Sequence, residues 1–179
     1  MQKLSKKKIS KIGILGGTFD PPHKGHLYIS KIALKKLKLN KLIWVVTKKN
    51  PLKRKPYLST KVRMKLSKKI TRKEKKIFVR YYDDKVKSIN TFNLLNYIKK
   101  KNKKTKIFFL IGTDNLAKFH KWNNWKKIPK LAKIAIFPRQ DHSIKSLNPI
   151  ASKKLNKKDL IYINAKKINI SSSLIRKFW

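Results

Sequence analysis

The sequence predicts an α/β fold built on a doubly wound parallel sheet. Short apolar runs rich in β-branched and aromatic residues recur along the chain, and amphipathic segments with helical spacing separate them. The clearest of these runs have no alternation of polar residues, which is typical of strands buried on both faces. Right-handed crossover connections would bring such strands together in one sheet.

The predicted strands and helices alternate in order. Strands are expected at residues 12–15, 42–46, 77–79, 107–111, 131–137 and 160–163. Helices are expected where apolar residues recur every three or four positions, at about 25–39, 60–70 and 88–98, with Ser59 or Thr60 as the N-cap of the second. No linker or repeat divides the chain. We therefore expect residues 1–179 to form a single domain, with residues 1–10 as a basic N-terminal extension.

The composition argues against several classes of protein. There are no cysteines, which excludes disulfides and thiolate metal sites. No run of 18 apolar residues is present, and the basic start of the chain does not lead into the apolar segment of a signal peptide. We therefore expect a soluble cytoplasmic protein with no membrane partner.

The charge of the chain is strongly positive, with a formal net charge of +43 at pH 7. Such a charge can bind nucleic acid without sequence specificity. However, the chain has 44 lysines and only six arginines, whereas dedicated phosphate and base recognition relies on arginine. The lysines are also spread along the whole chain. A compositional bias therefore explains the charge better than a specific nucleic-acid partner, although the positive field should concentrate nucleotides near a site.

The most informative segment is G-G-T-F-D-P-P-H-K-G-H at residues 16–26, between the first predicted strand and the first predicted helix. Gly16 and Gly17 allow a ligand to approach the backbone, and the start of the helix presents unpaired N–H groups to a phosphate. His23 and His26 add donors that can stabilise charge developing in a transition state. The segment is neither a P-loop nor a dinucleotide-binding fingerprint. It therefore predicts a phosphate site of a different kind.

A second segment follows the strand predicted at 107–111. Gly112-Thr113-Asp114 would place a hydroxyl and a carboxylate at the same edge of the sheet as the paired glycines. Phe119, Trp122 and Trp125 follow at a spacing of three, so they could share one face of a helical turn. These aromatic residues either pack in the core or stack on a flat heteroaromatic ligand.

A third segment, Ser171-Ser172-Ser173, precedes a short apolar segment near the C-terminus. These serines either cap a helix or use their hydroxyl groups to hold a triphosphate, with Arg176 one turn further as a charge partner. Both readings remain open from the residues alone.

The three segments together resemble one family of enzymes. Residues 16–26 resemble the (H/T)xGH signature of a nucleotidyltransferase superfamily, and residues 170–176 are similar to its ISSTxIR motif. Residues 112–125 resemble the GxDNLxxFxxWxxW segment of bacterial nicotinate-nucleotide adenylyltransferases. The resemblance implies a Rossmann-like nucleotidyltransferase domain that transfers the adenylyl group of ATP to nicotinate mononucleotide. The products would be nicotinate adenine dinucleotide and pyrophosphate, in the biosynthesis of NAD.

The resemblance also implies roles for individual residues. His23 and His26 would contact the ATP phosphates, with His26 at the transferring α-phosphate. The backbone and shape of the ATP site would come from Gly16, Gly17, Thr18 and Phe19, and the β and γ phosphates would be held by Ser172, Ser173 and Arg176. Substrate recognition would involve Lys53, at a phosphate of either substrate, and Asn90, Asp114, Trp122 and Arg139. Mg²⁺ would arrive with ATP, and no metal site built from protein residues is expected.

The chain departs from the family pattern at 88–93 and at 139–141, both near the expected mononucleotide side. Alternative functions therefore remain open. They are a phosphopantetheine adenylyltransferase, an adenylyltransferase that prefers nicotinamide mononucleotide, and a basic nucleic-acid-binding module without enzymatic activity. The oligomeric state is left open.

Overall fold

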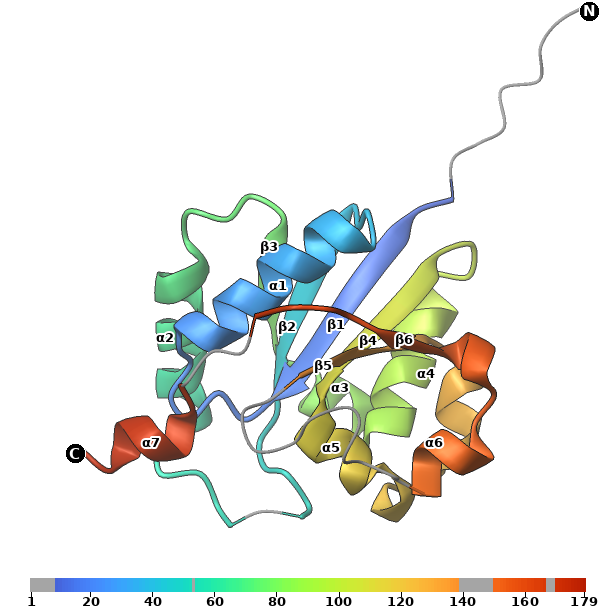
Figure 1. Cartoon of the computed structure of the whole chain (residues 1–179). Helices are drawn as coiled ribbons and strands as arrows, with labels where there is room; N and C mark the ends of the chain where they lie inside the picture. The colour runs from blue at the N-terminus through green and yellow to red at the C-terminus, as the bar shows by residue number, and fades with distance from the viewer. Residues whose placement is uncertain (1–8, 53, 139–149, 167–169) are drawn as a thin grey trace, which may run out of the picture.

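The computed structural model describes residues 9–52, 54–138, 150–166 and 170–179. Its centre is a sheet of six strands in which every neighbouring pair is parallel (Figure 1). The strand order is β3 (Ile77–Arg80), β2 (Lys41–Val46), β1 (Lys11–Gly17), β4 (Lys106–Gly112), β5 (Lys133–Phe137) and β6 (Leu160–Tyr162). This order confirms the predicted α/β class and the doubly wound parallel sheet.

Helices cover both faces of the sheet, so the core has two parts. On one face, α1 (Lys24–Lys36) and α2 (Thr60–Thr71) pack on the side chains of β2 and β3. On the other face lie α4 (Thr91–Lys101), α5 (Thr113–Ala117) and α6 (Ile150–Lys154). The direction of winding reverses between β1 and β4, and such a reversal opens a crevice at the carboxyl ends of the two strands.

Local interactions define the start of α2. Of the two candidate caps, Ser59 takes the N-cap position, and its Oγ accepts a hydrogen bond from the Val62 backbone N–H at 3.3 Å. The predicted second helix therefore begins as expected. No helix in the described ranges of the chain is long and apolar enough to cross a membrane.

The structure corrects several predicted boundaries. Gly16 and Gly17 belong to β1 rather than to a turn after it, and they pair with β2. The strand predicted from residue 131 begins at Lys133, because residues 125–130 form the 3₁₀ helix η2 (Trp125–Lys130) and Leu131 completes its last turn. The helix expected near residue 88 begins at Thr91, and a further short helix, α3 (Asp83–Val86), precedes it.

Candidate functional site

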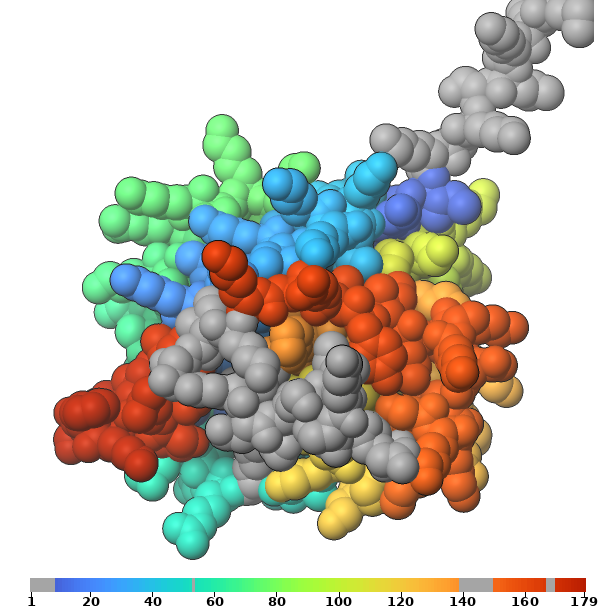
Figure 2. All heavy atoms as spheres, viewed as in Figure 1, coloured from blue at the N-terminus to red at the C-terminus, as the bar shows by residue number. Residues whose placement is uncertain are grey.

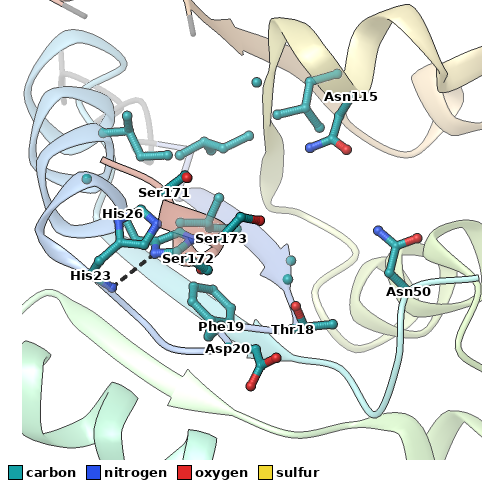
Figure 3. A pocket seen from close by; sticks show the side chains of 18 of the residues that line it. Thr18, Phe19, Asp20, His23, His26, Asn50, Asn115, Ser171, Ser172 and Ser173 are labelled. Atoms are coloured by element: carbon teal, nitrogen blue, oxygen red, sulfur yellow. Dashed lines mark hydrogen bonds between the residues drawn. The ribbon is translucent and has the colours of Figure 1, made fainter. Parts of the chain in front are cut away.

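A pocket of about 450 Å³ lies at the carboxyl ends of β1 and β4, where the winding of the sheet reverses. Its walls come from segments far apart in the sequence. These are the end of β1 and the turn after it, the start of α1, residues 54–57, the end of β4, and the C-terminal helix α7 (Ser172–Arg176) with the residues before it. Figure 3 shows His23 and His26 beside Ser171, Ser172 and Ser173, with Asn50 and Asn115 on the opposite side.

The structure brings most of the predicted site residues to this pocket. The lining includes Gly16, Gly17, Thr18, Phe19, His23, His26, Trp122, Ser172, Ser173 and Arg176. The N-terminal and C-terminal motifs, which are about 150 residues apart, therefore meet around one cavity, as the resemblance implied.

Two other predicted site residues are described but do not line the pocket, and two more are not described. Asn90 and Asp114 are not among its described lining residues; Asn90 precedes α4, whereas Asp114 lies in the first turn of α5 next to the lining residue Asn115. Lys53 and Arg139 lie outside the described residues. Their roles in substrate recognition remain predictions.

His26 is held in a defined orientation at the start of α1. The His23 backbone N–H donates to His26 Nδ1 at 3.2 Å, and the two imidazole rings lie 3.8 Å apart between centroids (Figure 3). An Nδ1 that accepts a hydrogen bond carries no proton, so the proton of the neutral imidazole is on Nε2. His26 can therefore donate a hydrogen bond from Nε2 to a ligand while its imidazole is neutral.

The stacked rings of Phe19 and Trp44 pack beside His26. Phe19 has a left-handed backbone conformation with φ of 50°, and its buried ring stacks on Trp44 with centroids 4.8 Å apart and lies 4.9 Å from the His26 ring. Trp44 Nε1 donates to Ser30 Oγ at 2.8 Å, and Ser30 Oγ donates to the His26 carbonyl oxygen at 2.7 Å. Rings and hydrogen bonds thus link β2 to the turn of α1 that carries His26.

Gly25 allows the close packing of this histidine pair, and Gly25→Ala tests it. A Cβ at residue 25 would lie 2.9 Å from His23 Nδ1 and 2.9 Å from Ile170 Cγ2, both of which would have to move. Alanine favours a helix by up to about 1 kcal/mol over glycine, whereas overpacking costs about 1–3 kcal/mol. We expect a net loss of about 1–2 kcal/mol in the free energy of unfolding in urea, together with a lower kcat.

The matched control for Gly25→Ala is Gly16→Ala, measured for stability alone. A Cβ at residue 16 would meet Phe109 Cε2 at 3.7 Å, an ordinary van der Waals distance. Its free energy of unfolding should stay near that of the wild type. Equal stability of the two variants would contradict the packing argument at Gly25.

The C-terminal serines have distinct positions. Ser171 is the N-cap of α7, and its Oγ accepts a hydrogen bond from the Leu174 N–H at 3.1 Å. Ser172 Oγ donates to the Pro21 carbonyl oxygen at 2.8 Å. All three serines line the pocket, and Ser171 also caps the helix, so the two alternatives left open by the sequence do not exclude each other.

Arg176 joins α7 to the turn after β1. Its guanidinium donates to the Asp20 carbonyl oxygen and lies 3.7 Å from the Asp20 carboxylate and 3.3 Å from Ser173 Oγ. A positive group is therefore held at the wall of the pocket, within reach of an anionic ligand.

The spacing of the aromatic residues after β4 suggested one shared helical turn, but the structure places them in separate elements. Phe119 lies in the 3₁₀ helix η1 (Phe119–Lys121), Trp122 follows it, and Trp125 begins η2. Phe119 is fully buried between the two tryptophan rings, at 5.1 Å and 6.3 Å between centroids. Trp125 packs against the core, whereas Trp122 also lines the pocket and can contact a flat ring there.

Two charged residues that sequence reasoning did not assign to the site organise its loops. Asp20 is 4% exposed, and its carboxylate oxygens accept hydrogen bonds from the N–H groups of Tyr57 and Leu58 at 2.8 and 2.9 Å. Arg63 is 1% exposed and donates to five oxygen atoms of the surrounding segments. Asp20 was visible in the sequence as part of the first motif, but nothing in the sequence indicated the partners of Arg63.

The electrostatics around Arg63 reflect its burial. Burial lowers the pKa of the guanidinium, and the nearby carboxylates of Asp20 and Asp83 oppose this change. Burial also raises the pKa of Asp83, whose carboxylate accepts a hydrogen bond from the Lys48 N–H at 2.6 Å. The segments after β1, β2 and β3 are thus linked through buried charged groups.

The described residues contain no group of three or more histidine, aspartate or glutamate side chains that could hold a metal ion. Among the described residues that line the pocket, Asp20 is the one with a carboxylate side chain. Both of its oxygens are engaged with backbone N–H groups.

Comparisons with known proteins agree with this architecture. Residues 14–178 match the cytidylyltransferase-like family. The chain is 50% identical to a probable nicotinate-nucleotide adenylyltransferase of Pelagibacter ubique (strain HTCC1062) over 97% of this chain and 96% of that protein. It is 37% identical to a probable nicotinate-nucleotide adenylyltransferase of Aliarcobacter butzleri (strain RM4018), over 93% and 86% of the two chains.

A solved structure shares the fold. The Plasmodium falciparum nicotinic acid mononucleotide adenylyltransferase complexed with NaAD superposes with a TM-score of 0.76 at 24% identity, over 94% of this chain and 83% of that one. The family match and the identities to relatives over nearly their full length decide the assignment. This chain belongs to the cytidylyltransferase-like family and, within it, to the nicotinate-nucleotide adenylyltransferases.

Proposed function

We propose that this protein transfers the adenylyl group of ATP to nicotinate mononucleotide, forming nicotinate adenine dinucleotide and pyrophosphate in the biosynthesis of NAD. The observation that carries the proposal is the meeting of the His23 and His26 motif with the serines and arginine of α7 around one pocket. Relatives named nicotinate-nucleotide adenylyltransferase support the choice of substrates. The cytoplasm, where ATP is available, is the proposed compartment.

In the proposed reaction, a phosphate oxygen of the mononucleotide attacks the α-phosphorus of ATP in line. The bond from this phosphorus to the oxygen that bridges it to the β-phosphorus breaks, and pyrophosphate leaves with that oxygen. Such a reaction depends on positioning and on neutralisation of charge rather than on a covalent enzyme intermediate. The chain supplies both through fixed donors around the pocket.

We assign the donors by their positions. His26 donates from Nε2 to the transferring α-phosphate, and His23 lies beside it. Ser172, Ser173 and Arg176 line the pocket from α7 and are assigned to the β and γ phosphates, with Ser172 exchanging its hydrogen bond to the Pro21 carbonyl oxygen for one to a phosphate. Asn115 lies on the opposite side of the pocket (Figure 3), and Trp122 is also among the lining residues, so both are available to the pyridine nucleotide.

Mg²⁺ is proposed to enter with ATP. The carboxylate of Asp20 is used by backbone N–H groups, so phosphate oxygens and water would supply most ligands of the ion. The ion would neutralise charge on the phosphates as pyrophosphate forms.

The test is pyrophosphate release in the presence of ATP and Mg²⁺, with nicotinate mononucleotide, nicotinamide mononucleotide and phosphopantetheine offered separately. We expect release with nicotinate mononucleotide and loss of release when EDTA removes Mg²⁺. Release with phosphopantetheine alone would contradict the assignment of residues 112–125. No release with any acceptor, together with salt-sensitive binding of nucleic acid, would favour the basic-module alternative.

A further inference from the structure

Tyr57 is an exposed aromatic residue at the rim of the pocket. Its side chain is 72% exposed, and it lies in the segment that leads into α2. In Figure 2 this blue-green segment lies against the dark red C-terminal helix α7. A large aromatic ring that is mostly in solvent contributes little to the core, so the role of Tyr57 depends on what its ring contacts at the rim of the pocket.

The backbone around Tyr57 is fixed by buried charged groups. The N–H groups of Tyr57 and Leu58 donate to the two carboxylate oxygens of Asp20 at 2.8 and 2.9 Å. The Leu58 carbonyl oxygen accepts a hydrogen bond from Arg63 Nε at 2.9 Å. Hydrogen bonds to charged groups are stronger than neutral ones, so the backbone that carries the exposed ring is held firmly.

The ring of Tyr57 contacts the guanidinium of Arg176. The guanidinium carbon lies 4.9 Å from the centroid of the ring, within the range of a cation–π interaction. The guanidinium also donates to the Asp20 carbonyl oxygen and to Ser173 Oγ, which leaves other N–H groups of its five for a phosphate. The ring supplies further support for the position of Arg176 through its π face.

We propose that Tyr57 is a positioning residue for ATP, which holds the guanidinium of Arg176 at the pocket wall ready for the β and γ phosphates. The proposal rests on the function of Arg176 proposed above. Asp20 supports both partners of this contact, because its carboxylate accepts a hydrogen bond from the Tyr57 N–H and it also lies beside the Arg176 guanidinium. Tyr57 acts through Arg176 and makes no bond to the reacting phosphorus.

The test compares Tyr57→Leu, which removes the aromatic face, with Tyr57→Phe, which keeps it. We expect Tyr57→Leu to weaken the binding of Mg·ATP by about two- to fivefold in titration calorimetry, which is the range of an exposed cation–π contact. KM for ATP should rise similarly, while kcat and KM for nicotinate mononucleotide change little. Tyr57→Phe should bind Mg·ATP with the affinity of the wild type.

A matched control is available on β3. Phe78 is a partly exposed aromatic residue with the guanidinium carbon of Arg80 at 5.8 Å from its ring, and neither residue lines the pocket. Phe78→Leu removes an equivalent pair and should leave the affinity for ATP unchanged. An equal loss of affinity in Phe78→Leu and Tyr57→Leu would overturn the proposal.

A double-mutant cycle separates this inference from the proposed function. In an Arg176→Ala background, Tyr57→Leu should cause no further loss of affinity for ATP, because the residue through which it acts is absent. If Tyr57→Leu instead lowers the affinity for ATP by about two- to fivefold in both the wild-type and the Arg176→Ala backgrounds, the inference is contradicted, while the function of Arg176 stands. If Arg176→Ala by itself leaves the affinity unchanged, the proposed phosphate contact is wrong, and the inference about Tyr57 fails with it.

Discussion

We expect His26→Ala to lower kcat for adenylyl transfer by about 100- to 1,000-fold, the usual effect of removing one preorganised donor to a developing charge. The structure gives His26 this property, because the His23 N–H engages Nδ1 and leaves the proton on Nε2. The ring is also supported by Phe19 and by the hydrogen-bonded pair of Ser30 and Trp44. Its donor is therefore in place before the charge develops, and little reorganisation is needed.

The measurement for His26→Ala is the initial rate of pyrophosphate release at saturating ATP and nicotinate mononucleotide, with the affinity for ATP measured separately by calorimetry. The affinity should change much less than kcat, because an interaction that strengthens in the transition state contributes little to ground-state binding. His120→Ala is the matched control, since His120 lies in η1 and is not among the described lining residues. A similar kcat for His26→Ala and the wild type would exclude His26 from the chemistry.

The strands of this fold could be predicted from the sequence because burial on both faces imposes a local composition. Residues 107–111 are apolar throughout, and all five are buried in β4. Residues 131 and 132 are equally apolar, but their N–H groups complete the last turn of η2 through the Ile128 carbonyl oxygen, so β5 begins later. Hydrophobicity therefore predicted burial correctly at residue 132 and secondary structure incorrectly.

The site could be predicted where its residues form contiguous motifs. The sequence predicts that the two motifs with His26 and Arg176 form one nucleotide site, and the structure brings both to one pocket. The supporting residues were missed because their partners are distant in the sequence and are backbone atoms. Arg63 donates to the carbonyl oxygens of Thr18 and Thr47, which are 45 and 16 positions away, and any residue type could supply these acceptors.

Arg63 is also the residue at which we expect the largest loss of stability. Its guanidinium donates to the carbonyl oxygens of Thr18, Thr47, Lys48 and Leu58 and to the hydroxyl oxygen of Thr60. These acceptors belong to the turn after β1, the segment after β2 and the start of α2. All five guanidinium donor positions are matched, which satisfies the hydrogen-bonding capacity of the buried group.

We expect Arg63→Met to lower the free energy of unfolding by about 3–5 kcal/mol, measured by urea denaturation. Methionine fills much of the volume, but it leaves buried acceptors without a donor and removes the positive charge near Asp20 and Asp83. This is a large part of the total, since domains are stable by about 5–15 kcal/mol. The free energy of unfolding of Arg63→Lys should lie between those of the wild type and Arg63→Met, because an ammonium group keeps the charge but has fewer donors.

Arg72 provides the control for Arg63, because it is an exposed arginine at the end of α2. Arg72→Met should change the free energy of unfolding by no more than about 0.5 kcal/mol, as is usual for exposed positions. If Arg63→Met were as mild as Arg72→Met, the three segments would be held by their own packing rather than by the guanidinium. The argument for a rigid backbone at Tyr57 would then depend on Asp20 alone, because Arg63 holds the Leu58 carbonyl oxygen and Asp20 holds the two N–H groups.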